Sequence, residues 1–403
     1  MLVHWIWLAH RPGLNDRAKL ALLRHFSDPE DIFFADSGAF DHIEELSAES
    51  REALLDKNLI PAEEILECCQ REKLSLLTFR DAAYPKRLKN ISDPPILLYY
   101  KGRLPDFDGS PLVGVVGTRK ASAYGMTQAR RMGYGLARCG CAVISGGARG
   151  IDTEALKGAL TGGGPAVAVL GCGVDVIYPK ENRNLFRDVE QNGCLVSEYP
   201  PGTEPYAGNF PVRNRIISAL SLGVLVAEAP EKSGALITAH RALDQGRDVF
   251  VLPANVDVES CGGNLKLLRD GAIPVRDAWD ILQEYVAQYP DILSQQDLGR
   301  QEPGDPTPEP PPAPVRSQKP ERKKVIDKPK NKAYIDVNEI MDTLSPDEQA
   351  LTRMLTDGPA HIDDIVERTG LGAGQALASL TLLEVRGIVR RPSPRMYELA
   401  ERP

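Results

Sequence analysis

Three short segments of the chain place positively charged side chains next to glycines or beside the start of a helix. They are Gly117-Thr118-Arg119-Lys120, Ser145-Gly146-Gly147-Ala148-Arg149-Gly150 and Phe210-Pro211-Val212-Arg213-Asn214-Arg215. Glycine exposes backbone N–H groups, the first turn of a helix carries partial positive charge, and the arginine fork matches phosphate. The segments therefore predict a site that holds a polyanion. Because no acid, base or nucleophile accompanies them at a catalytic spacing, we expect binding rather than catalysis.

Two further segments extend the predicted site. Lys180 stands just before a predicted helix, where its ammonium group can reach a phosphate. Ser233 and Gly234 expose amides at the start of another helix. Each segment taken alone is also compatible with an ordinary βα turn that carries a surface cation.

The two arginines of the third segment are expected to have different roles. Positions two apart in a helix diverge by about 200°. We therefore expect one of Arg213 and Arg215 to face the ligand. The other is expected to brace the fold against an acidic neighbour such as Glu198 or Glu228.

The loops argue against a nucleotide cofactor. The spacing in residues 145–150 is neither the dinucleotide fingerprint nor a P-loop, which requires a Gly-Lys-Ser/Thr ending. The first loop lacks the third glycine of the dinucleotide motif, and the second strand ends in Ser145 instead of a ribose-binding acid. We expect no cofactor.

Metal and thiol chemistry are also not expected. The seven cysteines are scattered and form no C-x-x-C pair, which fits a reducing cytoplasm. Cys172 has no histidine nearby, so packing is the favoured role. His240 has no partner at metal-ligand spacing.

Charge is distributed unevenly along the chain, whose formal net charge is −8. Residues 1–75 carry 8 Lys and Arg against 15 Asp and Glu, whereas residues 76–290 carry 24 against 22. A nucleic-acid surface is therefore expected on the central region. The apolar start, Met1–His10, lacks a basic leader and a cleavage site, so it predicts a buried helix, and no run is long enough to span a bilayer.

Periodicity and composition divide the chain into four regions. Residues 1–75 predict a helical module, residues 76–290 an α/β domain, and residues 291–335 an extended linker rich in proline and then in basic residues. Residues 336–403 predict three helices and a two-stranded wing. The third of these helices holds no Lys or Arg before Arg386, so contact through the wing alone or a protein-contact role is favoured over major-groove reading.

Strands and helices alternate through the central region. Expected strands cover 112–116, 141–145, 166–170, 193–197, 223–228 and 248–252, and expected helices cover 123–138, 152–160, 183–191, 213–220, 235–245 and 264–270. This alternation implies right-handed crossovers and a mostly parallel sheet. Ligands of such sheets bind at the carboxyl ends of the strands, where the glycine loops fall.

The central region closely resembles the DprA/Smf family (DNA-processing protein A). The resemblance rests on an ordered series of motifs: Gly-Thr-Arg at 117–119, Ser-Gly-Gly-Ala-Arg-Gly-Ile-Asp at 145–152, Gly-Cys-Gly-Val-Asp at 171–175, Phe-Pro-x-Arg-Asn-Arg at 210–215 and Ser-Gly-x-Leu-Ile-Thr-Ala at 233–239. It extends from Tyr84-Pro85 to Ala272, and the flanking helical and winged modules match the longer members. Two departures are Ala155-Leu156, where the family usually has Ala-His, and Pro253-Ala254, where it usually has Pro-Gly.

The resemblance implies an extended Rossmann-like domain, with a SAM-like or helix-hairpin-helix module before it and a winged helix after it. It implies a non-enzymatic protein that binds single-stranded DNA, forms a homodimer, delivers the strand to RecA and protects incoming DNA during natural transformation. The expected DNA-binding residues are Gly117, Thr118, Arg119, Lys120, Ser145, Gly146, Gly147, Arg149, Lys180, Arg213, Asn214, Arg215, Ser233 and Gly234. The dimer contacts are expected around Leu267, Leu268 and Arg269.

Two other functions remain as alternatives. The first is a nucleotide-processing enzyme of the lysine-decarboxylase-like Rossmann group, a nucleoside monophosphate phosphoribohydrolase. That group pairs a Gly-Gly-x-Gly-Thr loop with a catalytic Glu on the next helix, whereas here no acid follows Ser233–Thr238 before Asp244. The second is a transcriptional regulator acting through residues 340–400, which the uncharged third helix disfavours.

Overall fold

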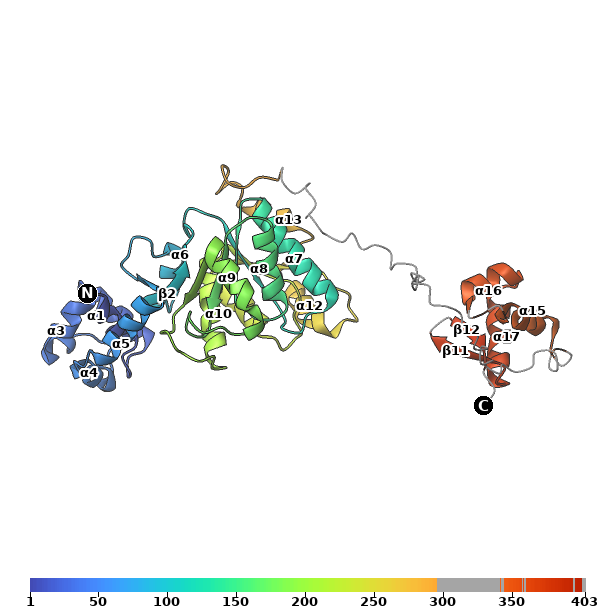
Figure 1. Cartoon of the computed structure of the whole chain (residues 1–403), viewed down its shortest axis with the longest axis horizontal. Helices are drawn as coiled ribbons and strands as arrows, with labels where there is room; N and C mark the ends of the chain where they lie inside the picture. Colours follow the sequence, from blue (N-terminus) through green and yellow to red (C-terminus); the bar gives the residue numbers. More distant parts are fainter. Residues whose placement is uncertain (296–340, 342–343, 357, 359, 394–395, 401–403) are drawn as a thin grey trace, which may run out of the picture. The chain divides into compact units, whose positions relative to one another are not determined.

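The computed structural model describes residues 1–295, 341, 344–356, 358, 360–393 and 396–400 (Figure 1). The chain divides into two compact units, one within residues 1–309 and the other within residues 310–403. Most of the predicted linker lies outside the described residues.

A nine-stranded sheet forms the frame of the larger unit. Its strands lie in the order β1-β2-β6-β5-β4-β3-β7-β8-β9. The strands from β6 to β9 across the sheet pair in parallel, whereas β1 and β2 are antiparallel at one edge. The bounds are β1 Ser75–Thr78, β2 Leu97–Gly102, β3 Leu112–Val116, β4 Ala142–Ser145, β5 Ala166–Leu170, β6 Gly193–Ser197, β7 Gly223–Val226, β8 Asp248–Val251 and β9 Ile273–Pro274. The α/β class with a mostly parallel sheet is thus confirmed.

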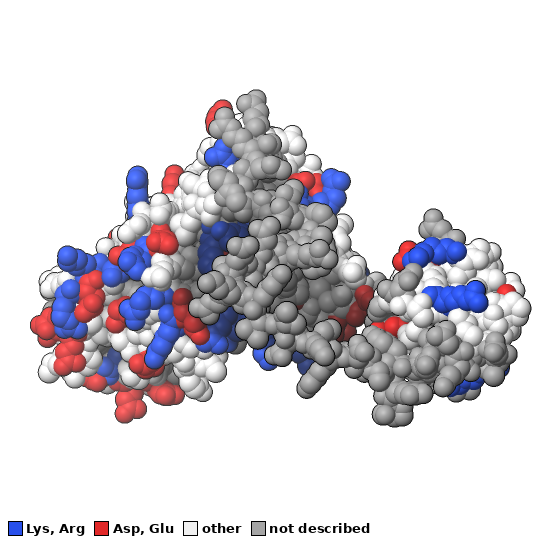
Figure 2. Space-filling model, turned by 45° about the vertical axis from the view of Figure 1, so that its right-hand side comes forward, with Lys and Arg blue, Asp and Glu red and all other residues white. Residues whose placement is uncertain are grey.

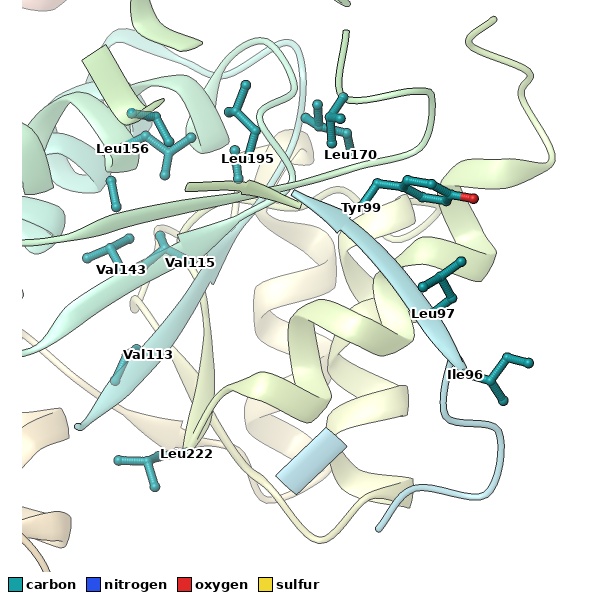
Figure 3. Close-up of a cluster of buried hydrophobic side chains, with 14 of the residues drawn as sticks. Ile96, Leu97, Tyr99, Val113, Val115, Val143, Leu156, Leu170, Leu195 and Leu222 are labelled. Carbon is teal, nitrogen blue, oxygen red and sulfur yellow. The ribbon is translucent and has the colours of Figure 1, made fainter. Parts of the chain in front are cut away.

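Helices cover both faces of this sheet, as right-handed crossovers require. Side chains of one face, including Val113 and Val115, belong to one hydrophobic core with α7, α8, α9 and α13. Figure 3 shows part of this first core. Leu112 and Val116, which alternate with these residues along β3, belong to the opposite core with α10, α11 and α12. The bounds are α7 Ala123–Arg138, α8 Ile151–Thr161, α9 Arg183–Asn192, α10 Asn209–Leu220, α11 Gly234–Asp244, α12 Gly262–Arg269 and α13 Ala278–Leu282.

The N-terminal helices share the first of these cores. They are α1 Leu2–Ala9, α2 Asp16–His25, α3 Pro29–Phe34, α4 Ala48–Leu55 and α5 Ile60–Arg71. Trp5 and Trp7 of α1 are buried with Tyr99 of β2, whose hydroxyl lies 2.8 Å from His10 Nε2. A capping box begins α3, with Asp28 and Asp31 bonded reciprocally.

The smaller unit has the predicted winged-helix architecture. It contains α15 Pro346–Leu355, α16 Ile362–Thr369, α17 Ala373–Val385 and a sheet of β10 Ala360–His361, β11 Val389–Ser393 and β12 Met396–Leu399. A capping box begins α15, with Ser345 and Glu348 bonded reciprocally. Two basic side chains of the wing lie against acids, Arg390 on Glu398 at 2.7 Å and Arg391 on Glu384 at 3.3 Å.

Candidate nucleic-acid interface

A cavity opens where the glycine loops meet the carboxyl end of β3. Its volume is about 470 Å3, and it is lined by the end of β3, the loop after it, and residues from the starts of α8, α10 and α11. Seven of the fourteen predicted site residues line it: Gly117, Thr118, Arg119, Arg213, Asn214, Ser233 and Gly234. The structure therefore gathers about half of the predicted set around one hollow.

The loop after β3 is held by the protein's own groups. The Thr118 amide donates to the Glu228 carbonyl at 2.7 Å, and an added Cβ on Gly117 would lie 2.8 Å from the same oxygen. The Glu228 carboxylate also accepts from the Ser122 amide at 3.1 Å and from its hydroxyl at 2.7 Å. A buried carboxylate therefore already occupies the start of α7, so of this segment only the Arg119 side chain at the cavity and the exposed Lys120 remain available to a phosphate.

The loop after β4 lies largely inside the protein. Ser145 is fully buried, and its hydroxyl donates to the Val115 carbonyl at 2.7 Å. An added Cβ on Gly146 would lie 2.6 Å from Arg213 Nη1 and 2.7 Å from Asp152 Oδ2. The Gly147 carbonyl accepts from Asn182 Nδ2 at 2.9 Å. Ser145, Gly146 and Gly147 therefore lie beneath the residues that line the cavity, among them Arg213 and Asp152, which form its floor.

A buried carboxylate lies beside that floor. Asp152, in the first turn of α8, accepts from the Ala148 amide at 3.3 Å and lines the cavity. Burial raises the pKa of Asp152 to about 6, and the nearby Arg213 only partly offsets this rise. The neighbouring Arg149 is exposed and pairs with Glu181 at 2.6 Å, so it lies outside the cavity lining.

Arg213 lies one turn inside α10 rather than at its start. The helix begins at Asn209, four residues earlier than predicted, with Pro211 in its first turn. Arg213 is only 3% exposed, yet it lines the cavity. Its Nη1 donates to the carbonyls of Gly146 and Val169, so the side chain ties the β4 and β5 ends together. Burial lowers the pKa of Arg213 to about 10.

Arg215 is the bracing arginine. It is 2% exposed and forms ion pairs with Glu198 at 2.8 Å, Asp93 at 3.3 Å and Asp16 at 3.7 Å. Burial alone would lower its pKa, but Glu198 and the other two acids raise it. The predicted pairing with Glu198 is confirmed, and Asp16 shows that this brace reaches the N-terminal helices.

Exposed positive charge remains at the rim. Arg119 and Lys232 line the cavity, and both are exposed. Lys120 and Lys180 are exposed but do not line it. The starts of α10 and α11 hold no acid in their first turns, and Ser233 caps α11 by accepting from the Ala235 amide at 3.2 Å. Among the described residues that line the cavity, Asp152 is the only acid.

Aromatic rings form part of the cavity wall, and the sequence reasoning did not select them. The Phe210 ring lies 5.1 Å from the Arg119 guanidinium carbon and 5.8 Å from that of Arg213. Tyr178 also lines the cavity, with its ring centroid 5.7 Å from that of Phe210. Tyr206, which is 72% exposed, lies just before α10, the helix that contains Phe210. A signal was available, because Phe210 and Tyr178 flank basic residues in the motifs themselves.

The predicted dimer residues lie elsewhere, on α12. Leu267 was expected at the surface as a dimer contact, but its side chain is buried in the core of its own chain. Leu268 and Arg269 line a groove with the exposed Val256, and this groove adjoins the cavity through Pro230 and Lys232. In the face drawn in Figure 2, Lys and Arg of the larger unit are interspersed with Asp and Glu rather than gathered in one field.

The described residues show neither a metal site nor a membrane-spanning helix. They contain no group of three or more His, Cys, Asp or Glu that could hold a metal ion. In the same part of the chain, no helix is both long enough and apolar enough to cross a membrane.

Comparisons of the sequence and of the fold with known proteins indicate one family. The model of the DNA recombination-mediator protein A family matches residues 75–286, and that of the DprA winged helix domain matches residues 340–393. The Smf protein of Synechocystis sp. is 33% identical over 98% of both chains. The X-ray structure of DNA processing protein A from Streptococcus pneumoniae is 34% identical, covers 70% of this chain and 98% of its own, and superposes with a TM-score of 0.61. The chain therefore belongs to the DprA/Smf family of DNA recombination mediators.

Proposed function

We propose that this protein binds single-stranded DNA at the cavity beside α10 and α11, protects the strand and delivers it to RecA. The family membership supports a role in DNA processing and recombination. The observation that carries the proposal is the convergence of two acid-free helix starts with Arg119 and Lys232 at one hollow. Amides and cations arranged in this way bind phosphates independently of base sequence.

The aromatic wall favours a single strand over a duplex. Phe210 and Tyr178 line a hollow, and an unpaired base can leave its stack and place its face on a ring there. The faces of paired bases are already stacked inside a duplex. The positions of Lys120 and Lys180 outside the cavity suit phosphates that lead into and out of it.

A homodimer would increase affinity for long strands. Leu268 and Arg269 border an adjoining groove that shares Pro230 and Lys232 with the cavity, so an interface there would cover one rim of the cavity and leave the side formed by Arg119 and Phe210 open. Two linked cavities on one strand would gain affinity through effective concentration. In a cell that takes up DNA, such a dimer would cover incoming strands until RecA replaces it.

A mobility-shift series tests this proposal. Single- and double-stranded DNA of equal length are titrated with the full chain, with and without RecA, and exonuclease digestion is followed in parallel. We expect a shift with single strands at lower protein concentration, resistance to the exonuclease, and faster RecA assembly on the coated strand. Equal affinity for both forms would contradict the single-strand proposal, and unchanged RecA assembly would contradict delivery.

A further inference from the structure

Another hollow lies where the N-terminal helices meet the β1–β2 edge of the sheet, and we call it the junction groove. Its volume is about 310 Å3, and its lining comes from α2, the residue after β1, the end of α6 (Lys86–Lys89) and the segment before β2. It shares no lining residue with the cavity beside α10 and α11. We propose that the junction groove binds a short acidic peptide segment of a partner protein, with one apolar side chain of the peptide inserted into the groove.

Most of the groove lining is apolar. Leu20 and Leu23 are three residues apart on α2, so they lie on one face of that helix, and they are 8% and 5% exposed. Phe79 and Ile91 line the groove from the side of the sheet, and both are half-buried. The volume lies at the lower end of the range of about 300–1,000 Å3 that ligand pockets occupy, so the groove suits one large side chain.

The walls of the groove are tied together by the protein itself. Arg80, directly after Phe79, donates from Nη2 to the Leu23 carbonyl at 2.7 Å and to the Phe26 carbonyl at 2.9 Å. These bonds join the segment after β1 to the end of α2. A groove whose walls are already fixed needs little reordering when a ligand enters, which favours binding.

The charge of the lining selects an acidic ligand. Arg24 and Lys89 are the only charged side chains among the described residues that line the groove, and both are exposed. They come from different walls, α2 and α6. Arg24 Nη1 lies 3.5 Å from Glu45 Oε1, and the guanidinium has five N–H donors, so donors remain for a carboxylate of the ligand. Acidic residues on both sides of an inserted apolar side chain match this arrangement.

A peptide fits the groove better than a nucleic-acid strand does. Lys89 Nζ lies 4.6 Å from the centroid of the Phe79 ring, so a cation already occupies a face on which a base would stack. Residues 1–75 carry 15 Asp and Glu against 8 Lys and Arg, so a strand that extended from the groove over this module would be repelled. A short peptide places its few carboxylates at the two cations alone.

Anisotropy titrations of the full chain test the proposal. The probes are fluorescein-labelled heptapeptides that have Leu, Phe or Trp at the centre and two acidic residues on each side. We expect at least one of them to bind about tenfold more tightly than the peptide with a central Gly, because that peptide buries no apolar side chain. Peptides with Lys in place of the acids should bind as weakly as the Gly peptide. Equal binding of all these peptides would overturn the proposal.

Substitutions at the rim identify the groove as the site. Arg24→Gln/Lys89→Gln should weaken binding of the acidic peptide by about fivefold or more, since it removes two ion pairs. Its unfolding temperature and its affinity for an oligothymidylate should not change. Lys157→Gln/Arg276→Gln removes the same charge from exposed residues outside the groove, so it should retain the peptide. Equal peptide binding by the two double variants would overturn the proposal.

A competition experiment separates a peptide site from a nucleic-acid site. Because the groove and the cavity share no lining residue, the acidic peptide should bind with unchanged affinity when the oligothymidylate is saturating. Displacement of the peptide by the oligothymidylate would assign the groove to nucleic acid and overturn the proposal. A chain that binds the peptide without binding the oligothymidylate would contradict only the proposed function.

Discussion

Neighbouring arginines in the same hexapeptide serve different parts of the molecule. Arg213 points its guanidinium at the ends of β4 and β5 and lines the cavity, whereas Arg215 pairs with three acids. The 200° rotation between positions two apart in a helix explains the separation. Helical geometry thus allowed the difference in role to be predicted. Their burial followed from long-range partners, which local sequence does not reveal.

The pKa of Asp152 leads to a pH prediction. Burial raises this pKa from 3.8 to about 6, so the neutral form persists to a higher pH in the folded state than in the unfolded chain. Its contribution to stability is therefore full below pH 3.8 and is lost as the pH rises through about 6. As the pH falls from 7 to 5, protonation also removes a negative charge from the cavity lining. Single-stranded DNA should then bind more tightly, by about fivefold for an effect of about 1 kcal/mol.

Anisotropy titrations at pH 7 and pH 5 check this prediction. Asp152→Asn should bind at pH 7 with the affinity that the natural chain reaches at pH 5, and should lose most of the pH dependence. Asp244→Asn, at the far end of α11, is the control and should behave like the natural chain. A pH dependence that persists in Asp152→Asn would assign it to another group.

At the scale of elements, α10 connects the cavity to the N-terminal helices. Arg213 of this helix lines the cavity, and Arg215 pairs with Asp16 of α2. The partners of Arg215 come from α2, from the segment before β2 and from the segment after β6. A single buried side chain therefore joins regions that sequence periodicity separates at residue 75.

Replacing Arg215 should loosen this connection. Arg215→Met leaves three partly exposed acids without their partner, and loss of a hydrogen bond to a charged group costs about 1.5–3 kcal/mol. Thermal unfolding should report the loss, and hydrogen exchange should increase first in α2. Arg24→Met removes an exposed arginine that lies 3.5 Å from Glu45, so it should cost less than about 1 kcal/mol. Equal thermal stability of the two variants would show that the ion pairs of Arg215 do not hold the N-terminal helices to the rest of the larger unit.

Most elements of the central region could be predicted because the pattern of apolar residues differs between strands and helices. The expected strands at 112–116, 166–170 and 193–197 match β3, β5 and β6. The sequence reasoning did not identify β1 and β2, because two antiparallel edge strands lack the strand–helix alternation on which it relied. The predicted start of α10 is four residues late, because the helix begins at Asn209 and has Pro211 in its first turn. The hydrogen bonds from Ser122, the N-cap of α7, to Glu228 join residues 106 positions apart, so no local pattern predicts them.

At the scale of the whole molecule, the proposed DNA site lies entirely within the larger unit. The cavity lining comes from residues 116–238, and the smaller unit has its own hydrophobic core. The exposed residues of α17 include Leu377 and Leu382, and the helix carries no basic residue, so it lacks the charge that phosphate binding needs.

Removal of the winged helix tests this division of labour. A chain that ends after residue 295 should bind single-stranded DNA with the affinity and salt dependence of the full chain, as measured by anisotropy. A loss of about tenfold or more, which is 1.4 kcal/mol, would place part of the DNA site in the smaller unit or the linker.

The salt dependence of single-strand binding tests the central claim most directly. In a plot of log affinity against log salt, each phosphate contact on a single strand contributes a slope of about −0.7, so Arg119→Ala/Lys180→Ala should flatten the slope by about 1.4 and weaken binding. The control Lys157→Ala/Arg276→Ala removes the same charge from residues that pair with Glu154 and Asp280, and it should leave the slope unchanged. A slope that is the same in both double variants would contradict the claim that Arg119 and Lys180 hold the strand.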